Sequence, residues 1–600
     1  MVEQIKDRIR ELRKKLKEYD AQWYLTDTAD PHNSEYINDH YKEREFLSGF
    51  TGSAGTLLIG DDIALLWTDG RYFVQAVEEL MDTGIILMRE GDAGVPDLYE
   101  YLENNIPSGD TLLCDGRLIS CKMGRRIREC LKSMGASLKV GKNLVDLIWN
   151  DRPEDSCNDI RLLPAELYGQ EYREKISDLR DAIAAKGAVA SVISGLDEQM
   201  WLFNLRGSDI LYNPVAYAYT VVTDTGVSLY VKERAITDEL CRYAEDEDIT
   251  LKAYEDFYKD LPYLKFMGKV LIDPDKTNYL ICRILERSGT ELIECLSPLT
   301  EAKAVKTPKE IGLLKDAYLK DSAVLTRFLK YVKESAVADK ADEYTLALRL
   351  DSMRAQIKGF NDLSFTTISA FGPNAAMMHY EAPEEGSAKI AGSGFYLVDS
   401  GAQYDGGTTD VTRTLLLGEA EDIKKKHFTR VVAGMLALQN AVFLKGCGGR
   451  NLDILARGPI WEMDMDYKCG TGHGVGYMLN VHEGPAGIRW KQKIAGSDYP
   501  IEAGMTLSDE PGVYIAGKYG IRIENILLCV RRCENGDGEF LAFEPLTWVP
   551  IDKDAVKKEY LEPKELKWLN DYHAKVREKL MPFMENEDER VWLIKATSEL

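Results

Sequence analysis

The stretch from residue 379 to residue 524 constrains the fold of this chain more than any other, because it places five potential metal ligands among strand-like runs. Two of them flank the turn Tyr404-Asp405-Gly406-Gly407, which joins two apolar, β-rich runs and predicts a hairpin with both carboxylates on one sheet surface. Glycines precede and follow the third, and the last two lie on a further predicted strand pair. The five residues are Asp399, Asp410, His473, Glu510 and Glu524.

The chemistry of this ligand set indicates a metal centre. Four carboxylates crowded together repel one another and are driven to protonate unless cations neutralise them. One imidazole among four carboxylates is an oxygen-rich set, which suits Mn, Co or Fe-type divalent ions or Zn. Four carboxylates exceed the needs of one ion, whereas two ions roughly 3.5–4 Å apart can share bridging carboxylates and hold a hydroxide between them. The residues therefore predict a two-metal hydrolase.

Each acid taken alone is better explained as a solvated turn residue, since most Asp and Glu side chains are exposed. The histidines argue against that explanation for the group, because four of the seven in the chain fall in this stretch: His379, His427, His473 and His482. His379 and His482 stand at the ends of apolar runs, where active-site residues commonly project. His427 follows a lysine run in a helical pattern, and we expect it to be exposed.

The motifs DSGAQY, TTDVTRT, GTGHGVG, NVHEGP, SDEPG and GIRIEN occur in an order that resembles the Xaa-Pro aminopeptidase (aminopeptidase P) family of pita-bread metallopeptidases, in its long three-domain form. The resemblance covers nearly the whole chain. It implies a dinuclear site that usually holds Mn²⁺, with Zn²⁺ or Co²⁺ as alternatives. In that site Asp410 and Glu524 bridge the ions, Asp399 ligates one, and His473 with Glu510 ligates the other.

The resemblance also implies roles outside the ligand set. His379 and His482 match the substrate-contacting and proton-handling histidines of the family, and Glu510 is the expected proton carrier. Arg522 matches an arginine that lies behind the metal ligands and near the substrate. Arg71 is expected to reach toward the active-site cleft, and an ordinary surface arginine is the alternative. One departure is Cys469, where many three-domain members carry a His; we expect it to lie near the site without ligating a metal.

These features predict an aminopeptidase that releases the first residue of a peptide with proline second. A Xaa-Pro dipeptidase (prolidase) with the same metals is the first alternative. A non-catalytic binding protein of the same fold is a second, which the retention of all five ligands disfavours.

Composition restricts the partners and the compartment. A net charge of −24 repels phosphate backbones and predicts no nucleic-acid partner. Eleven cysteines without a CxxC pair, and the lack of any apolar run long enough to span a membrane, predict a cytoplasmic protein without a membrane partner.

The order of apolar runs, turns and helical patterns predicts a mixed α/β and α+β chain of three domains. Residues 1–153 and 154–301 each read as an α/β domain, and the second echoes the first as a degenerate duplication. Residues 302–600 begin at a helix start near Thr307-Pro308 and carry the ligands. The resemblance identifies the first two as creatinase-like domains and the third as a pita-bread catalytic domain with a curved antiparallel sheet and a C-terminal helical extension.

The C-terminal helical pattern leaves one largely apolar face that needs a partner. It is formed by Leu566, Leu569, His573, Val576 and Leu580. Packing against the rest of its own domain is one explanation, and a homodimer, which the family commonly shows, is the other.

Overall fold

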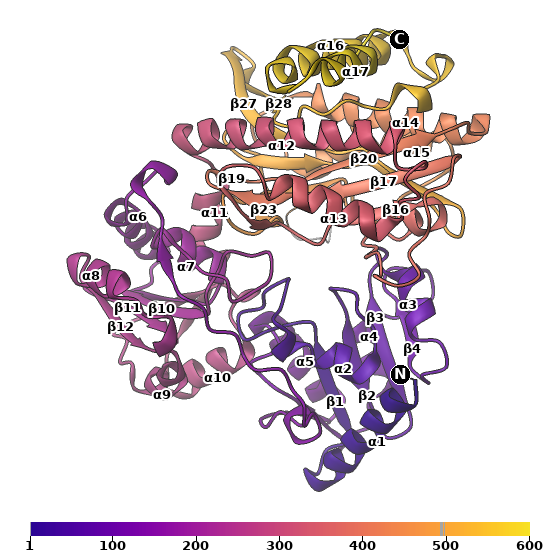
Figure 1. Ribbon diagram of the computed structural model, residues 1–600. Helices are drawn as coiled ribbons and strands as arrows, with labels where there is room; N and C mark the ends of the chain where they lie inside the picture. The colour runs from indigo at the N-terminus through magenta and orange to yellow at the C-terminus, as the bar shows by residue number, and fades with distance from the viewer. Residues whose placement is uncertain (1, 492–495, 497) are drawn as a thin grey trace. The chain divides into compact units, whose positions relative to one another are not determined.

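The computed structural model describes residues 2–491, 496 and 498–600 of this 600-residue chain (Figure 1). The chain divides into two compact units. The N-terminal unit comprises Met1–Pro164 and Gln170–Thr300, and the C-terminal unit comprises Ala165–Gly169 and Glu301–Leu600. Within the described residues, none of the helices combines the length and the apolar composition needed to cross a bilayer.

The first part of the N-terminal unit is built on a mixed six-stranded sheet of strand order β4-β3-β2-β1-β5-β6. β1, β2 and β3 form an antiparallel meander, whereas β4, β5 and β6 each join in parallel. Helix α1 packs on this sheet because its apolar residues recur at helical spacing and are buried. The elements are α1 Val2–Glu18, β1 Trp23–Asp27, α2 Glu43–Ser48, β2 Thr56–Ile59, β3 Ala64–Thr68, α3 Phe73–Glu79, β4 Ile86–Arg89, α4 Leu98–Asn105, β5 Thr111–Cys114, α5 Cys121–Ser133 and β6 Ser137–Val140.

The second part of the N-terminal unit repeats this design. Its sheet has the order β12-β11-β10-β8-β13-β14, with the same alternation of antiparallel and parallel neighbours. The prediction of a second α/β domain of similar type is therefore confirmed. The elements are β7 Arg161–Leu162, α6 Tyr172–Ala185, β8 Ala190–Ile193, α7 Leu196–Leu202, β9 Leu205–Arg206, β10 Ala218–Thr223, β11 Val227–Val231, α8 Asp238–Asp246, β12 Ile249–Ala253, α9 Phe257–Asp260, β13 Val270–Ile272, α10 Tyr279–Arg287 and β14 Leu292–Glu294.

The C-terminal unit combines antiparallel sheets with long helices (Figure 1). Its largest sheet has the order β21-β28-β27-β24-β22-β23, and a three-stranded sheet has the order β16-β17-β20. The strands are β15 Phe360–Leu363, β16 Ile368–Phe371, β17 Gly394–Ser400, β18 Ala402–Tyr404, β19 Gly407–Thr408, β20 Val411–Leu417, β21 Val442–Leu444, β22 Gly472–Gly474, β23 Glu483–Ile488, β24 Thr506–Asp509, β25 Gly512–Ile515, β26 Tyr519–Arg522, β27 Asn525–Asn535 and β28 Gly538–Pro545. The helices are α11 Pro298–Ala304, which begins in the N-terminal unit, α12 Pro308–Glu334, α13 Glu343–Arg354, α14 Asp422–Gln439, α15 Gly449–Trp461, α16 Pro563–Leu580 and α17 Glu587–Ala596.

Helix α12 begins where the sequence predicts. Thr307 caps it, with its side chain accepting from the Glu310 backbone N–H while the Glu310 carboxylate accepts from Thr307. Pro308 occupies the first turn, where its missing N–H costs no hydrogen bond.

Helix α16 uses its apolar face inside the C-terminal unit. Leu569, His573, Val576 and Leu580 are buried, and the three aliphatic residues belong to the same core as α14 and β26, while Leu566 is half-buried. His573 accepts a hydrogen bond from the Ile551 backbone N–H, at 3.1 Å. The apolar face of α16 is therefore covered by other residues of the C-terminal unit.

Candidate metal centre

The predicted ligands lie in or next to strands of the C-terminal unit. Asp399 lies near the end of β17, and Asp410 lies directly before β20, which pairs with β17 in the predicted hairpin. His473 is the middle residue of β22. Glu510 follows β24, and Glu524 lies between β26 and β27, so these two glutamates flank the β25–β26 hairpin.

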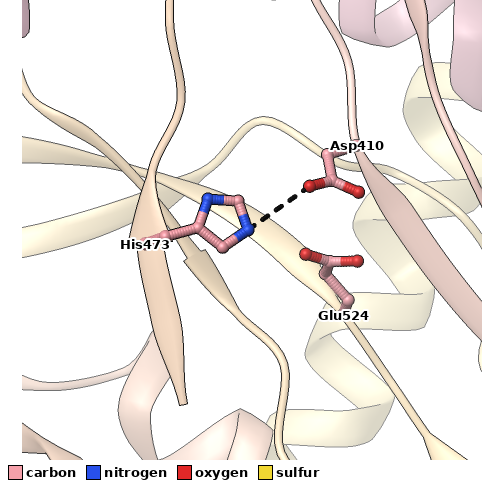
Figure 2. A group of neighbouring side chains, drawn as sticks. All are labelled: Asp410, His473 and Glu524. Carbon is pink, nitrogen blue, oxygen red and sulfur yellow. Dashed lines mark ion pairs between the residues drawn. The ribbon is translucent and has the colours of Figure 1, made fainter. Parts of the chain in front are cut away.

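Three of these residues form a tight cluster. One ligand atom from each of Asp410, His473 and Glu524 lies within 4.8 Å of the others. Figure 2 shows the imidazole pointing at the two carboxylates, with His473 Nε2 3.5 Å from Asp410 Oδ2. Glu510 Oε1 lies 3.4 Å from the same nitrogen. The structure thus brings three of the four predicted carboxylates around the imidazole of His473.

The hydrogen bond of the His473 ring fixes its tautomer. Nδ1 lies 2.9 Å from the Gly474 carbonyl oxygen, which can only accept, so Nδ1 carries the proton. In the neutral ring, Nε2 then presents a lone pair to the carboxylates of Asp410 and Glu510. A lone pair facing two carboxylates is repulsive unless a cation or a proton lies between them, and a ring N–H held by a carbonyl is typical of metal-binding histidines.

Arg522 binds one of the two carboxylate oxygens of Asp399. Arg522 donates to its Oδ2 from Nη2 at 2.6 Å and from Nε at 3.2 Å. Its Oδ1 is buried and has no hydrogen-bond partner among the residues that the structure describes. A buried carboxylate oxygen without a donor costs free energy, and a metal ion supplies the missing partner.

Burial and mutual repulsion dominate the electrostatics of the cluster. Burial, reinforced by the charges of Asp399 and Glu510, raises the pKa of Asp410 well above its ordinary value. Burial, reinforced by the charges of Asp410 and Asp399, also raises the pKa of Glu524 well above its ordinary value. Burial also raises the pKa of Glu510, although Arg522 opposes the shift. Four carboxylates, one imidazole and an unpartnered oxygen therefore fit divalent cations.

Two supporting residues escaped sequence analysis. Tyr514 accepts from Arg522 Nη1 at 2.8 Å, which extends the chain that begins at Asp399. Thr412 donates to Glu524 Oε2 at 2.8 Å and accepts from Arg522 Nε at 3.1 Å. Strand alternation offers a signal for Tyr514, because the β25–β26 register pairs Gly512 with Arg522 and puts Tyr514 on the same face.

The histidines outside the ligand set differ in position. The His482 ring lies 4.2 Å from that of His473 in an edge-on arrangement. His379 is half-buried in a turn, and the carbonyl of the preceding Met378 accepts from Arg522 Nη2 at 3.2 Å. The expectation of an exposed His427 is wrong: it is 8% exposed, and its Nδ1 lies 2.8 Å from the Tyr519 hydroxyl, because this side of α14 packs against β26.

Arg71 belongs to the N-terminal unit, where its guanidinium pairs with Asp69 at 2.8 Å. Cys469 is half-buried and packs against the core that contains β26. All eleven cysteines are free thiols.

Comparison with known families divides the chain into four matched regions. Residues 312–531 match metallopeptidase family M24, and residues 539–600 match the C-terminal region of that peptidase family. Residues 8–148 and residues 151–310 each match the Creatinase/Prolidase N-terminal domain.

Of three individual relatives, two cover nearly the whole chain and one covers part of it. The probable Xaa-Pro aminopeptidase P of Aspergillus clavatus is 40% identical over 99% of this chain and 93% of its own length. The crystal structure of X-prolyl aminopeptidase from Caenorhabditis elegans, described as a cytosolic enzyme with a di-nuclear active site, is 34% identical, covers 99% of both chains and superposes with a TM-score of 0.93. The Xaa-Pro dipeptidase from Bacillus anthracis is 26% identical with a TM-score of 0.51, and covers 64% of this chain and 99% of its own.

Proposed function

We propose that this chain is a metal-dependent aminopeptidase. It belongs to metallopeptidase family M24 and, within that family, to the Xaa-Pro aminopeptidase P enzymes. The fold is that of the family: two creatinase-like α/β domains precede a pita-bread domain. The reaction releases the N-terminal residue of a peptide that has proline in second place. The observation that carries this proposal is the buried convergence of Asp410, His473 and Glu524 in a chain so closely related to these enzymes.

Two divalent metal ions are the cofactors, and we propose Mn²⁺ ahead of Zn²⁺ or Co²⁺ because four of the five ligands are carboxylates. Asp410 and Glu524 would bridge the ions, Asp399 would ligate one, and His473 with Glu510 would ligate the other. When bound, the ions supply Lewis-acid chemistry, which activates water as a nucleophile and polarises the substrate carbonyl at neutral pH.

Glu510 is suited to carry the proton. Its Oε1 accepts from the Ser508 hydroxyl at 3.1 Å and lies 3.4 Å from His473 Nε2, so this carboxylate is held at the cluster where the proton would be transferred. It takes the proton from the attacking water and passes it to the proline nitrogen as the bond breaks. That nitrogen belongs to a tertiary amide without an N–H, so peptidases that hydrogen-bond this group of their substrates cannot hold a Xaa-Pro bond.

His379 and His482 are proposed to donate hydrogen bonds to the substrate carbonyl and to the oxyanion that develops from it. One such donor typically contributes roughly 2.7–4 kcal/mol to lowering the barrier. Arg522 keeps Asp399 oriented and lies next to the backbone that leads to His379. Arg71 is proposed as a further substrate contact.

Other features predicted from the sequence or from the resemblance remain proposals. They are the domain division at 1–153, 154–301 and 302–600, a peptide substrate without a nucleic-acid or membrane partner, and a homodimer. A cytoplasmic location is supported by the description of the C. elegans enzyme as cytosolic. The face of α16 that we considered for dimerisation is covered within the C-terminal unit, so a dimer needs another surface.

A comparison of substrates tests the proposed activity against that of a dipeptidase. Purified protein with Mn²⁺ should release the first residue of Arg-Pro-Pro far faster than that of Arg-Pro, and should leave Arg-Ala-Pro uncleaved. Preference for Arg-Pro would make the protein a prolidase, and loss of the proline requirement would refute the proposal.

A further inference from the structure

Strand β22 and the loop that joins it to β23 carry two of the three histidines proposed for the site, His473 and His482. We define the histidine loop as residues 473–483, which begins at the metal-binding position His473 and ends at Glu483, directly after His482. Gly474 and Glu483 pair across its neck. A side chain at Gly474 would come within 2.3 Å of the Glu483 carbonyl oxygen, so the two ends approach as closely as backbones allow. The two ends of the loop are therefore coupled, so a contact that fixes the loop also positions the rings of His473 and His482.

The inner side of the histidine loop is tied to the β18–β19 hairpin. Gln403 Nε2 donates to the Leu479 carbonyl oxygen at 2.9 Å. The Thr408 hydroxyl lies 3.1 Å from the same oxygen and 3.2 Å from the Leu479 nitrogen. Since Asp410 follows two residues after Thr408, this contact links the loop directly to the carboxylate cluster.

The outer side of the histidine loop is held by a short segment that is distant in sequence. The Tyr477 hydroxyl donates to the Leu167 carbonyl oxygen at 2.7 Å, across 310 positions of the chain. Leu167 lies in Ala165–Gly169, the stretch that belongs to the C-terminal unit although its flanks do not. Lys309 Nζ, at 2.6 Å from the Ala165 carbonyl oxygen, fastens the other end of this stretch to α12.

A second segment holds the end of the loop through a buried charge cluster. Lys303 Nζ lies 2.7 Å from Glu483 Oε1, and Lys306 Nζ binds the other carboxylate oxygen. The three side chains are at most 2% exposed. Burial lowers the pKa of Lys306, while Glu483 opposes that shift. Two ammonium groups on one buried carboxylate fix its position more tightly than a single pair does, because neither oxygen is left free.

We propose that Tyr477 and Glu483 are positioning residues of the active site, through which Ala165–Gly169 and Glu301–Thr307 hold the histidine loop in register with the carboxylates. This inference rests on the proposed function. It goes beyond that function because both anchoring segments lie outside the ligand motifs. Neither Tyr477 nor Glu483 is assigned a contact with substrate; each acts through His473 and His482.

A pair of tyrosine variants separates positioning from general stabilisation. Tyr477→Phe removes the hydroxyl that holds the loop. Tyr331→Phe is the matched control, because the Tyr331 hydroxyl makes a 2.8 Å bond to Asp339 Oδ2, and both residues lie outside the histidine loop and outside its two anchoring segments. For Tyr477→Phe we expect roughly tenfold weaker Mn²⁺ binding in a titration. We also expect amide exchange at residues 475–482 to rise roughly tenfold, with no such change in the control.

Lysine variants test the second anchor. Lys306→Met leaves the Lys303–Glu483 pair in place, whereas Glu483→Gln removes the carboxylate that both buried ammonium groups share, so Glu483→Gln should melt at the lower temperature. Both should lower kcat, by about tenfold or more, since small displacements of catalytic groups are costly. Lys333→Met removes a partly buried pair with Asp552, at 2.9 Å, and should affect melting temperature alone.

The outcomes are distinguishable. Amide exchange and Mn²⁺ titration need no substrate, so they test the positioning even if the wild-type protein were to leave Xaa-Pro-Xaa peptides intact, which would refute the proposed function alone. If Tyr477→Phe and Lys306→Met match Tyr331→Phe and Lys333→Met in exchange, Mn²⁺ affinity and kcat, the positioning role is overturned. If Tyr477→Phe does not fold, the comparison of Lys306→Met with Lys333→Met decides.

Discussion

Replacing Asp410 by Asn in the metal-free protein should stabilise the C-terminal unit, although the same change weakens metal binding. The reason is the crowding of carboxylates without cations. The ligand atoms of Asp410 and Glu524 lie within 4.8 Å of each other, and Glu510 reaches the same imidazole. An amide at position 410 removes one negative charge from this cluster and keeps nearly the same shape.

Two estimates give the size of the effect. Two unit charges separated by 4.8 Å repel by about 3.5 kcal/mol at an effective dielectric constant of about 20. If the Asp410 carboxyl is instead protonated, keeping it neutral at pH 7 costs about 4 kcal/mol, the free energy of protonating a group of ordinary pKa near 3.9. In a unit of this size roughly 2 °C corresponds to each kcal/mol, so the metal-free variant should melt about 5 °C or more above the metal-free wild type.

The pH dependence has a definite sign. Burial and the neighbouring charges raise the folded-state pKa of Asp410 and of Glu524, so the folded protein binds protons that the unfolded chain has released. The stability that these groups contribute is complete below the unfolded pKa, near 4, and is lost as the pH rises toward the folded pKa. The advantage of Asp410→Asn should therefore grow from pH 6 to pH 8.

Calorimetry of chelated protein at several pH values is the appropriate assay, with the exposed Asp224→Asn as the control. Adding Mn²⁺ should reverse the order, since the ions stabilise the wild type by mass action more than they stabilise the variant. Metal-free Asp410→Asn that melts at or below the metal-free wild type at pH 8 would refute the crowding on which the metal argument rests.

Further variants test individual roles. Glu510→Gln should retain at least one ion by elemental analysis while kcat falls by roughly 10²–10⁴, because the amide offers an oxygen ligand but cannot take up and release a proton. Near wild-type turnover would remove Glu510 from the mechanism. Tyr514→Phe removes the acceptor of Arg522 Nη1 at 2.8 Å and should weaken Mn²⁺ binding roughly tenfold in a titration, with unchanged affinity as the contradicting result. Cys469→Ser should keep both metals with at most a modest change in KM, and a protein with one ion after dialysis would make Cys469 a ligand.

The parts of the site that sequence predicts are those encoded by local pattern. Asp399 and Asp410 flank a turn with two glycines between apolar runs, and the strands β17 and β20 pair as that pattern requires. The start of α12 follows from Thr307, Pro308 and Glu310, whose capping roles act within four residues. The duplicated N-terminal half is visible as an echo in sequence, and the two sheets share one strand order.

The parts that sequence misses depend on contacts between distant residues. Periodicity places His427 on a lysine-rich helix but does not reveal that Tyr519 and β26 cover it. The ion pairs of Lys303 and Lys306 with Glu483 join positions 180 and 177 residues apart, and no local pattern specifies them. The bond from Tyr477 to Leu167 is hidden for the same reason.

The most direct test of the central claim is one titration on one sample. The protein is stripped of metal with a chelator, assayed on Arg-Pro-Pro, and assayed again during addition of Mn²⁺ while bound metal is counted by elemental analysis. The proposed dinuclear site predicts no turnover without metal and full turnover as bound metal approaches two ions per chain. Undiminished hydrolysis by the metal-free protein, or full activity at one ion per chain with no further binding, would contradict it.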